Sequence, residues 1–313
     1  MRISKTNILI AFLSLAVMGM AGAIYRQFSD EQRAIALGDV SKLSARDKMV
    51  YTDLKDGAFH EKVKPGASDW LAQHKEAGQT FTQYLRSSPN LPNNRKNILY
   101  IQPLGDFPKE NAPDLQILLE YTKAYYHPMK VVMNKAIPAD KIKATKRMNA
   151  GQRQWLTGDI LSQMYSEHLP DDAYSFLAVT MTDLYPKPEW NYVFGMASLK
   201  HRVGVFSFAR YTDKDKKLAL KRAVKVLSHE TGHMFGIKHC IFYQCNMGGV
   251  NHLGEMDSSP MHLCPICLRK LQHSAKFKPL ERYQKLYEFY EKHGLNEEAK
   301  WVRTRMKSIR AVN

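Results

Sequence analysis

Three histidines at regular spacing in one short segment have the side chains of a metal site. His229 and His233 flank Glu230, and Gly236 and His239 follow, so that HETGHMFGIKH matches the pattern HExxHxxGxxH. Four residues are slightly more than one helical turn, and both imidazoles therefore project from one helix face toward a common ion. Gly236 can adopt the positive φ that ends the helix and turns the chain back. The spacing predicts zinc on His229, His233 and His239.

Glu230 supplies the remaining group that a hydrolase needs. Zinc with three protein ligands keeps a position open for water and lowers the pKa of that water toward about 7. A neighbouring carboxylate can accept the water's proton and pass it on. We therefore expect a zinc metallopeptidase that hydrolyses a peptide or protein substrate with Glu230 as the general base. The alternative is a zinc-binding scaffold or pseudopeptidase with a basic interaction surface, although such a site would be expected to have lost the glutamate.

All four cysteines of the chain lie close to the histidine motif, at Cys240, Cys245, Cys264 and Cys267. Two short spacings and one longer gap suit a closed tetrahedral zinc site made wholly of thiolates. Two disulfides are the main rival, because an exported chain favours them, and buried small apolar side chains are another. A CxxC disulfide, however, closes a strained loop and is more often redox-active than structural. We expect two zinc ions per chain, the second fixing the loop that carries His239.

HETGHMFGIKHC, followed by C-N-M and LCPIC, resembles the archaemetzincins, a metzincin-clan family that combines HExxHxxGxxHC, CxM and CxxC. The resemblance covers roughly residues 68–275 and includes SDW, TDLYP, WNYVFGMASL and GVFSFARY. It implies that the three histidines hold the catalytic zinc, that Glu230 is the general base and that the four cysteines hold a second zinc. It also implies that Met247 is the Met-turn methionine, an apolar floor beneath the catalytic ion, where an ordinary core methionine is the alternative.

The elements that must position these groups alternate between strand and helix. Strands are predicted at 97–105, 130–138 and 175–186, and helices at 114–127 and 155–169. This alternation predicts an α/β (α+β) fold with a mixed, mainly parallel twisted sheet, which agrees with the metzincin-like fold that the resemblance implies. Two β-rich runs between 193 and 211 leave no room for a helix. They predict an antiparallel edge strand, along which an extended substrate could bind by backbone pairing.

A long active-site helix carries the HExxH residues. Thr212 or Asp213 is its predicted N-cap, and the helix is expected to run to Gly236. The tail from Lys278 is amphipathic and predicts a pair of helices broken at Gly294.

Several further residues are weaker candidates for the site. Asn251, His252 and Asp257 fall between the two cysteine pairs, where a plain loop role outweighs a place in the cleft. Arg210 and Tyr211 are candidates for stabilising an oxyanion, but packing at a strand end explains them as well.

The N-terminus has the three parts of a secretory signal peptide. Arg2 and Lys5 precede an apolar run over 8–25 that contains the sequence AGA ending at Ala23. The run is also long enough to cross a bilayer as an uncleaved anchor, and a buried core helix is the third reading. We expect the protein to be exported or membrane-anchored, with its catalytic domain outside the cytoplasm.

The chain of 313 residues is expected to divide into four parts: a signal peptide or anchor over 1–23, an N-terminal helical extension and linker over 24–90, a zinc metallopeptidase domain over 91–275 and a helical tail over 276–313. Its 46 Lys and Arg outnumber 30 Asp and Glu, giving a net charge of +16. Such a charge favours acidic partners, but no nucleic-acid-binding motif accompanies it, so nucleic acid is not an expected partner. We expect a monomer.

Overall fold

The computed structural model describes residues 28–53, 57–198, 201–211 and 213–311. The predicted signal peptide or anchor over 1–23 lies outside these ranges. Within them, no helix is both long enough and apolar enough to cross a membrane.

A five-stranded sheet forms the centre of the fold. Its order is β2 (Lys130–Met133), β1 (Ile98–Leu104), β5 (Ala173–Thr180), β8 (Val203–Ser207) and β7 (Gly195–Ser198). The first four strands are parallel, and β7 runs antiparallel to β8 at the edge. The predicted α/β fold, with its mainly parallel sheet and antiparallel edge strand, is therefore confirmed.

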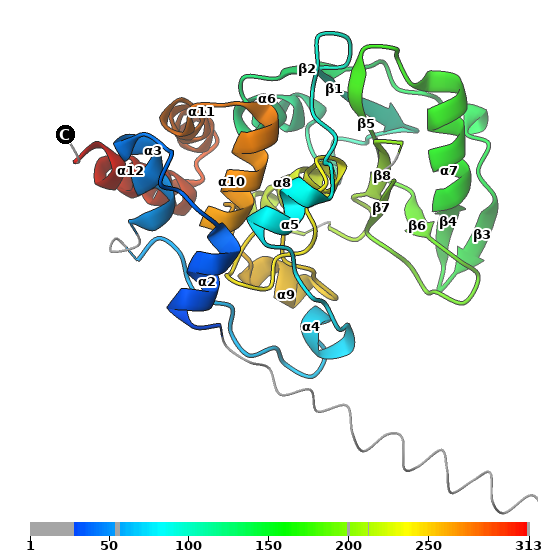
Figure 1. Ribbon diagram of the computed structural model, residues 1–313. Helices are drawn as coiled ribbons and strands as arrows, with labels where there is room; N and C mark the ends of the chain where they lie inside the picture. The colour runs from blue at the N-terminus through cyan, green and yellow to red at the C-terminus, as the bar shows by residue number, and fades with distance from the viewer. Residues whose placement is uncertain (1–27, 54–56, 199–200, 212, 312–313) are drawn as a thin grey trace, which may run out of the picture.

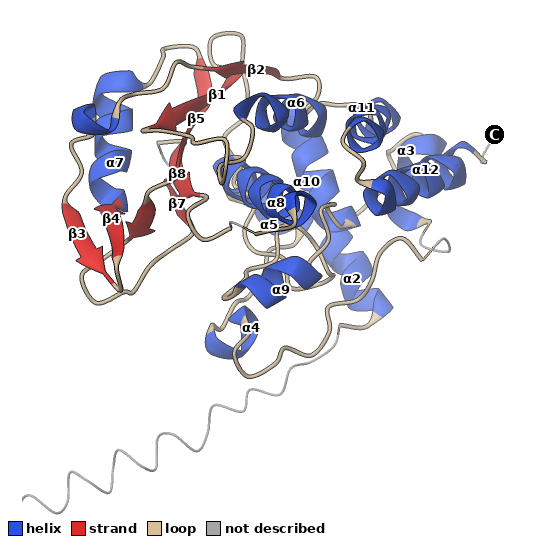
Figure 2. Ribbon diagram, turned by 180° about the vertical axis from the view of Figure 1, so that it is seen from behind, coloured by secondary structure: helices blue, strands red, loops and turns tan. Residues whose placement is uncertain are grey.

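Helices cover both faces of this sheet, as Figures 1 and 2 show from opposite sides. Helix α7 (Thr157–Gln163), continued by a π-helical turn over Met164–His168, packs on one face, and α6 (Leu115–Tyr125) and α8 (Lys216–Met234) pack on the other. Strand β5 is buried along its whole length because successive side chains enter different cores.

Helix α8 positions the first two histidines and begins later than predicted. Asp215 is the N-cap, and its carboxylate accepts hydrogen bonds from two backbone N–H groups of the first turn at 2.8 and 3.3 Å. The predicted cap at Asp213 is wrong, because its carboxylate instead pairs with Arg222; Thr212 lies outside the described residues. Gly236 follows the helix end with φ of +79°, the left-handed conformation expected of it.

A second sheet was missed by the sequence analysis. It consists of β3 (Lys146–Asn149), β4 (Gln152–Leu156) and β6 (Asp183–Tyr185). The predicted helix over 155–169 is wrong at its start, since Trp155 lies in β4, and the single strand over 175–186 is really β5 followed by β6. The start of the helix is wrong because Ala150 and Gly151, with positive φ of 47° and 76°, form a tight turn that folds β3 back onto β4. The strand divides because the chain bends at 181–182, after which β6 pairs with β4.

The remaining helices surround the cysteine segment and form the tail. They are α2 (Asp30–Leu37), α3 (Ala45–Thr52), α4 (Trp70–Gln73), α5 (Phe81–Arg86), α9 (Leu253–Ser258), α10 (Pro265–Ala275), α11 (Pro279–Lys292) and α12 (Asn296–Arg310), with a short 3-10 turn at Ala139–Lys141. Helix α10 packs against α2, α3 and α5. The predicted helical tail is confirmed as the pair α11 and α12, which turn at Gly294 with φ of +64°.

Candidate active site and metal centres

The structure brings the three histidines of the motif together in one cleft. His229 and His233 lie one turn apart on α8, and His239 enters from the loop that follows Gly236. Their Nε2 atoms converge, and those of His229 and His233 are 3.0 Å apart. The three ring centroids lie 4.6 to 5.1 Å from one another.

The opposite ring nitrogens are all held by oxygen atoms. Nδ1 of His229 lies 2.8 Å from the carbonyl oxygen of Asn246, and Nδ1 of His233 lies 2.7 Å from that of Ile237. Nδ1 of His239 lies 2.6 Å from a carboxylate oxygen of Glu76. Because these oxygens only accept, each neutral ring must carry its proton on Nδ1.

This tautomer leaves the Nε2 lone pair of each ring free, and each of the three rings has a nitrogen within 4.8 Å of the other two. Two bare nitrogen lone pairs 3.0 Å apart repel each other unless a cation lies between them. Nitrogen ligands at zinc–nitrogen distances of about 2.0–2.1 Å are separated by about 3.3–3.4 Å at the tetrahedral angle, so the observed spacing is slightly shorter than that of two ligands of one zinc ion. Desolvation in the cleft lowers the pKa of His229 well below its usual value and that of His233 to about 4, which keeps both rings neutral.

Glu230 lies in the same cavity as the histidines. Desolvation raises the pKa of its carboxyl group to about 7. Among the described residues, no donor makes a hydrogen bond to this carboxylate, so it remains available to a water molecule or a substrate. The neighbouring Tyr211 is buried, and desolvation together with the charge of Glu230 raises the pKa of its hydroxyl group.

Of the two proposed oxyanion groups, Arg210 is engaged elsewhere. Its guanidinium donates two hydrogen bonds to the carboxylate of Asp183, at 2.9 and 2.8 Å, and stacks over the ring of Tyr192. Packing and pairing at the strand end therefore account for it. The hydroxyl of Tyr211 has no hydrogen-bond partner within the described part of the chain.

Met247 lies directly beneath the helix that carries the histidines. It is 1% exposed, and a Cβ added at Gly232 would come within 2.5 Å of its sulfur. The Met247 carbonyl also accepts a hydrogen bond of 2.7 Å from the backbone N–H of Cys240. This close packing explains why glycine occupies the fourth position of HETGH, and it sets Met247 against the helix that carries the histidines.

The four cysteines form a second buried cluster. Their sulfurs all lie within 4.8 Å of one another, and those of Cys240 and Cys264 are 3.5 Å apart. None is in a disulfide. Sulfur atoms around one zinc at 2.3 Å are separated by about 3.8 Å, so the cluster fits a tetrahedral thiolate site. The Cys245 sulfur accepts hydrogen bonds from the backbone N–H groups of Met247 and Cys264, at 3.4 and 3.2 Å.

The cleft is a cavity of about 710 Å³. Besides the histidines and Glu230, its lining includes Trp70, Phe194, Lys225, Val250 and Met256. Phe194 immediately precedes β7, so the edge strand borders the cleft. Trp70 lies in the predicted extension over 24–90, which therefore contributes to the site.

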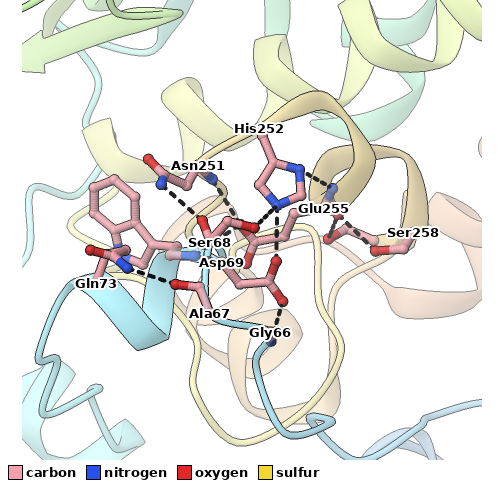
Figure 3. Close-up of polar contacts among 11 residues, drawn as sticks. Gly66, Ala67, Ser68, Asp69, Gln73, Asn251, His252, Glu255 and Ser258 are labelled. Atoms are coloured by element: carbon pink, nitrogen blue, oxygen red, sulfur yellow. Dashed lines mark hydrogen bonds and ion pairs between the residues drawn. The ribbon is translucent and has the colours of Figure 1, made fainter. Parts of the chain in front are cut away.

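The segment around Trp70 is tied to α9 by polar contacts (Figure 3). Asp69 and His252 point toward each other, with Oδ1 and Nε2 2.9 Å apart. The Glu255 carboxylate accepts hydrogen bonds from the backbone N–H groups of Trp70 and Asn251, at 3.0 and 2.8 Å. Asp69, His252 and Glu255 thus satisfy one another and nearby backbone groups, and they serve as ties between two walls of the cleft.

The three candidates between the cysteine pairs differ in their roles. Asn251 lines the cavity, whereas His252 caps α9 and Asp257 pairs with Arg222. Sequence reasoning missed Glu76 and Trp70 altogether, and it did not assign a role to Asn246. Asn246 lies in the segment C-N-M and Trp70 in SDW, two segments that resemble the archaemetzincins, so the resemblance could have indicated both residues. Glu76 had none.

Comparison with known proteins gives consistent matches. The model of peptidase family M54 matches residues 115–273. Archaemetzincin-2 of Homo sapiens is 37% identical over 257 residues, covering 70% of this chain and 71% of the relative. Archaemetzincin-2 of Mus musculus is 34% identical over 303 residues, covering 84% of each chain. The crystal structure of archaemetzincin from Archaeoglobus fulgidus complexed with malonate is 31% identical and covers 55% of this chain and 99% of that chain, with a TM-score of 0.45.

Proposed function

This chain belongs to the archaemetzincins, peptidase family M54, a family of zinc metallopeptidases, and we propose that it hydrolyses peptide bonds at the histidine cleft. The observation that carries the proposal is the convergence of three Nε2 lone pairs beside the Glu230 carboxylate in one cavity. His229, His233 and His239 would hold the ion. Zinc bound there would supply a Lewis acid for the scissile carbonyl and for the attacking water.

The remaining steps belong to the protein's own groups. The Glu230 carboxylate accepts a proton from the attacking water as the new C–O bond forms. It returns that proton to the amine nitrogen as the C–N bond breaks. Desolvation supports this double role, because a carboxyl group with a pKa of about 7 can both accept and donate a proton near neutral pH.

Backbone groups at the edge of the sheet position the substrate. Strand β7 pairs only with β8 within the described chain, so its other edge can accept an extended peptide. The cleft begins at the N-terminal end of this strand, where Val193, Phe194 and Gly195 line the cavity. A substrate lying along β7 would place its backbone beside the histidines and Glu230.

The cysteine cluster would hold a second, structural zinc, which would give two ions per chain. All four ligands would be protein sulfurs, which leaves no open position for catalysis. Cys240 directly follows His239, so its binding to zinc would fix the loop on which the third histidine lies. A monomer suffices for the whole arrangement, since one chain supplies every group.

We also propose that residues 1–23 direct the protein out of the cytoplasm, either as a cleaved signal or as an anchor. The basic start and the apolar run over 8–25 support this. The all-cysteine site would then have to take up its zinc before its thiols are oxidised.

The alternative of a zinc-binding scaffold without catalysis is weaker, because Glu230 is retained and lines the cleft. Profiling the cleavage of an unbiased peptide library tests the choice. The wild type should cleave a defined set of peptides, and Glu230→Ala should cleave none at a comparable rate. A wild type loaded with zinc that leaves the library intact would support the scaffold instead.

A further inference from the structure

A buried lysine lies in the wall of the cleft, one helical turn before the first histidine. Lys225 precedes His229 by four residues on α8, so the two side chains project from the same face of the helix. The lysine is 7% exposed and lines the same cavity as the histidines. The side chain of a basic residue therefore lines the cavity in which we expect a substrate to bind.

Among the described residues, the hydrogen-bond partners of the Lys225 ammonium group are backbone carbonyls. Its Nζ donates hydrogen bonds to the carbonyl oxygens of Met256 at 2.8 Å and of Asp257 at 3.3 Å, at the C-terminal end of α9. An ammonium group has three N–H donors, so one is left over. No carboxylate in the described ranges forms an ion pair with Lys225.

The acidic side chain whose charge acts most strongly on Lys225, that of Asp257, is already paired. The carboxylate of Asp257 accepts two hydrogen bonds from Arg222, at 2.8 and 2.6 Å. Arg222 also contacts Asp213, at 3.2 Å. Within the described residues the charge of Lys225 thus has no carboxylate in direct contact, and only the more distant charges of Asp257 and Glu298 act on it. A buried charge without a direct counterion is unfavourable. Burial lowers the pKa of Lys225 to about 8, which still leaves it mainly protonated at neutral pH.

The cavity residues suit a substrate group that has an aliphatic chain and ends in a carboxylate. Val226, Val250 and Met256 line the same cavity and offer apolar contacts. Helix α9, which receives the ammonium group, is held in place by the contacts of Glu255 with the Trp70 segment (Figure 3). This part of the cleft is therefore formed before a substrate binds.

We propose that Lys225 binds a carboxylate group of the substrate, so that the enzyme selects peptides with a glutamate side chain near the scissile bond or with a free carboxyl terminus there. Both sources present the same chemistry to the ammonium group. The inference rests on the proposed peptidase function and adds a substrate class to it. The competing explanation is that Lys225 only ties the end of α9 to α8, which would give no selection among substrates.

The test uses full-length, zinc-loaded protein and one peptide that the wild type cleaves. Glutamate and its neutral isostere glutamine are placed in turn at each of the three positions on either side of the scissile bond, with the carboxyl terminus free or amidated. The ratio of kcat/KM values between paired peptides is measured for wild type, Lys225→Met and Lys225→Arg. Lys221→Met is the matched control, because Lys221 lies on the same helix one turn earlier and pairs with Glu298 at 2.8 Å.

We expect the wild type to favour the carboxylate at least about tenfold at one position, as a hydrogen-bonded charge pair does. Lys225→Met should abolish this ratio, Lys225→Arg should retain part of it, and Lys221→Met should leave it unchanged. A preference for internal glutamate assigns the carboxylate to a side chain, whereas a preference for the free terminus assigns it to the peptide end.

Two results overturn the inference alone: a wild type that cleaves paired peptides equally at every position, and a preference that survives in Lys225→Met. If Lys225→Met does not fold, as judged by its thermal midpoint, Lys225→Gln replaces it, since an amide can still donate to the Met256 carbonyl. A wild type that cleaves no peptide overturns the proposed function, and this inference with it.

Discussion

The Glu76 carboxylate lies 2.6 Å from Nδ1 of His239 and 2.9 Å from the indole nitrogen of Trp70. The Trp70 ring in turn meets the edge of the His239 ring, with centroids 5.2 Å apart. A residue of the N-terminal segment therefore fixes both the tautomer and the orientation of the third histidine. His239 stands on a loop rather than on a helix, so it depends on this contact more than His229 and His233 do.

Substituting Glu76 by glutamine should weaken zinc binding at the histidine site. The amide has nearly the same size but lacks the charge that stabilises the Nδ1 proton, and loss of such a supporting group typically costs about 10–100-fold in metal affinity. Competition with a chelator of known affinity measures the change. Glu31→Gln, on the exposed side of α2, serves as the control. Unchanged zinc affinity in Glu76→Gln would mean that Glu76 does not position the ligand.

The two proposed zinc ions should leave the protein in a fixed order. Purified protein should contain two zinc ions per chain, and a chelator should remove the ion of the histidine site first, together with activity, because that site keeps an open position. The cysteine site should retain its ion longer, since structural zinc contributes about 10–16 kcal/mol of apparent binding free energy in small domains. Metal analysis during chelation, alongside turnover, follows both. A single zinc with four oxidised cysteines would refute the thiolate site and leave the histidine site standing.

Replacing Cys264 by serine should lower the stability of the fold, and it should reduce peptidase activity only indirectly. The variant should lose one zinc per chain, melt at a lower temperature and become more sensitive to proteases around His239. Its activity should fall only as a consequence of these changes. Zinc content, thermal midpoint and limited proteolysis measure the three effects, and Cys240→Ser should behave alike. Two zinc ions and wild-type stability in Cys264→Ser would show that the second site lies elsewhere.

The fate of the N-terminus should distinguish the two export modes. Protein expressed with its native N-terminus should begin at Ile24 if a signal peptide is cleaved, or at Met1 in a membrane fraction if the segment is an anchor. N-terminal sequencing of fractionated cells decides between them. A cytoplasmic product outside the membrane fraction that begins at Met1 would contradict both.

Local spacing explains which parts of this site could be predicted from the sequence. His229 and His233 follow helical periodicity, and Gly236 meets a local backbone requirement, so their positions could be derived from neighbouring residues alone. The short spacings of Cys240 and Cys245, and of Cys264 and Cys267, also predict the two halves of the cysteine cluster. These residues come together in the structure as expected.

Long-range contacts explain what could not be predicted. Glu76 reaches His239 across 163 residues, and no spacing rule connects a carboxylate in a loop to a distant imidazole. The hairpin of β3 and β4 was missed because Trp155, an apolar residue before a helix, fits either element until its strand partners are known. The sequence likewise could not show that Arg222 pairs with the Asp257 carboxylate, so that Lys225 has no carboxylate in direct contact among the described residues.

The most direct test of the peptidase mechanism is the turnover of Glu230→Gln beside wild type, with zinc per chain and thermal midpoint measured on the same samples. Glutamine preserves the size of the side chain but cannot accept a proton from water. The variant should keep both zinc ions and the wild-type midpoint while losing at least about a hundredfold in kcat. Turnover near the wild-type rate in a folded, zinc-loaded Glu230→Gln would contradict the mechanism.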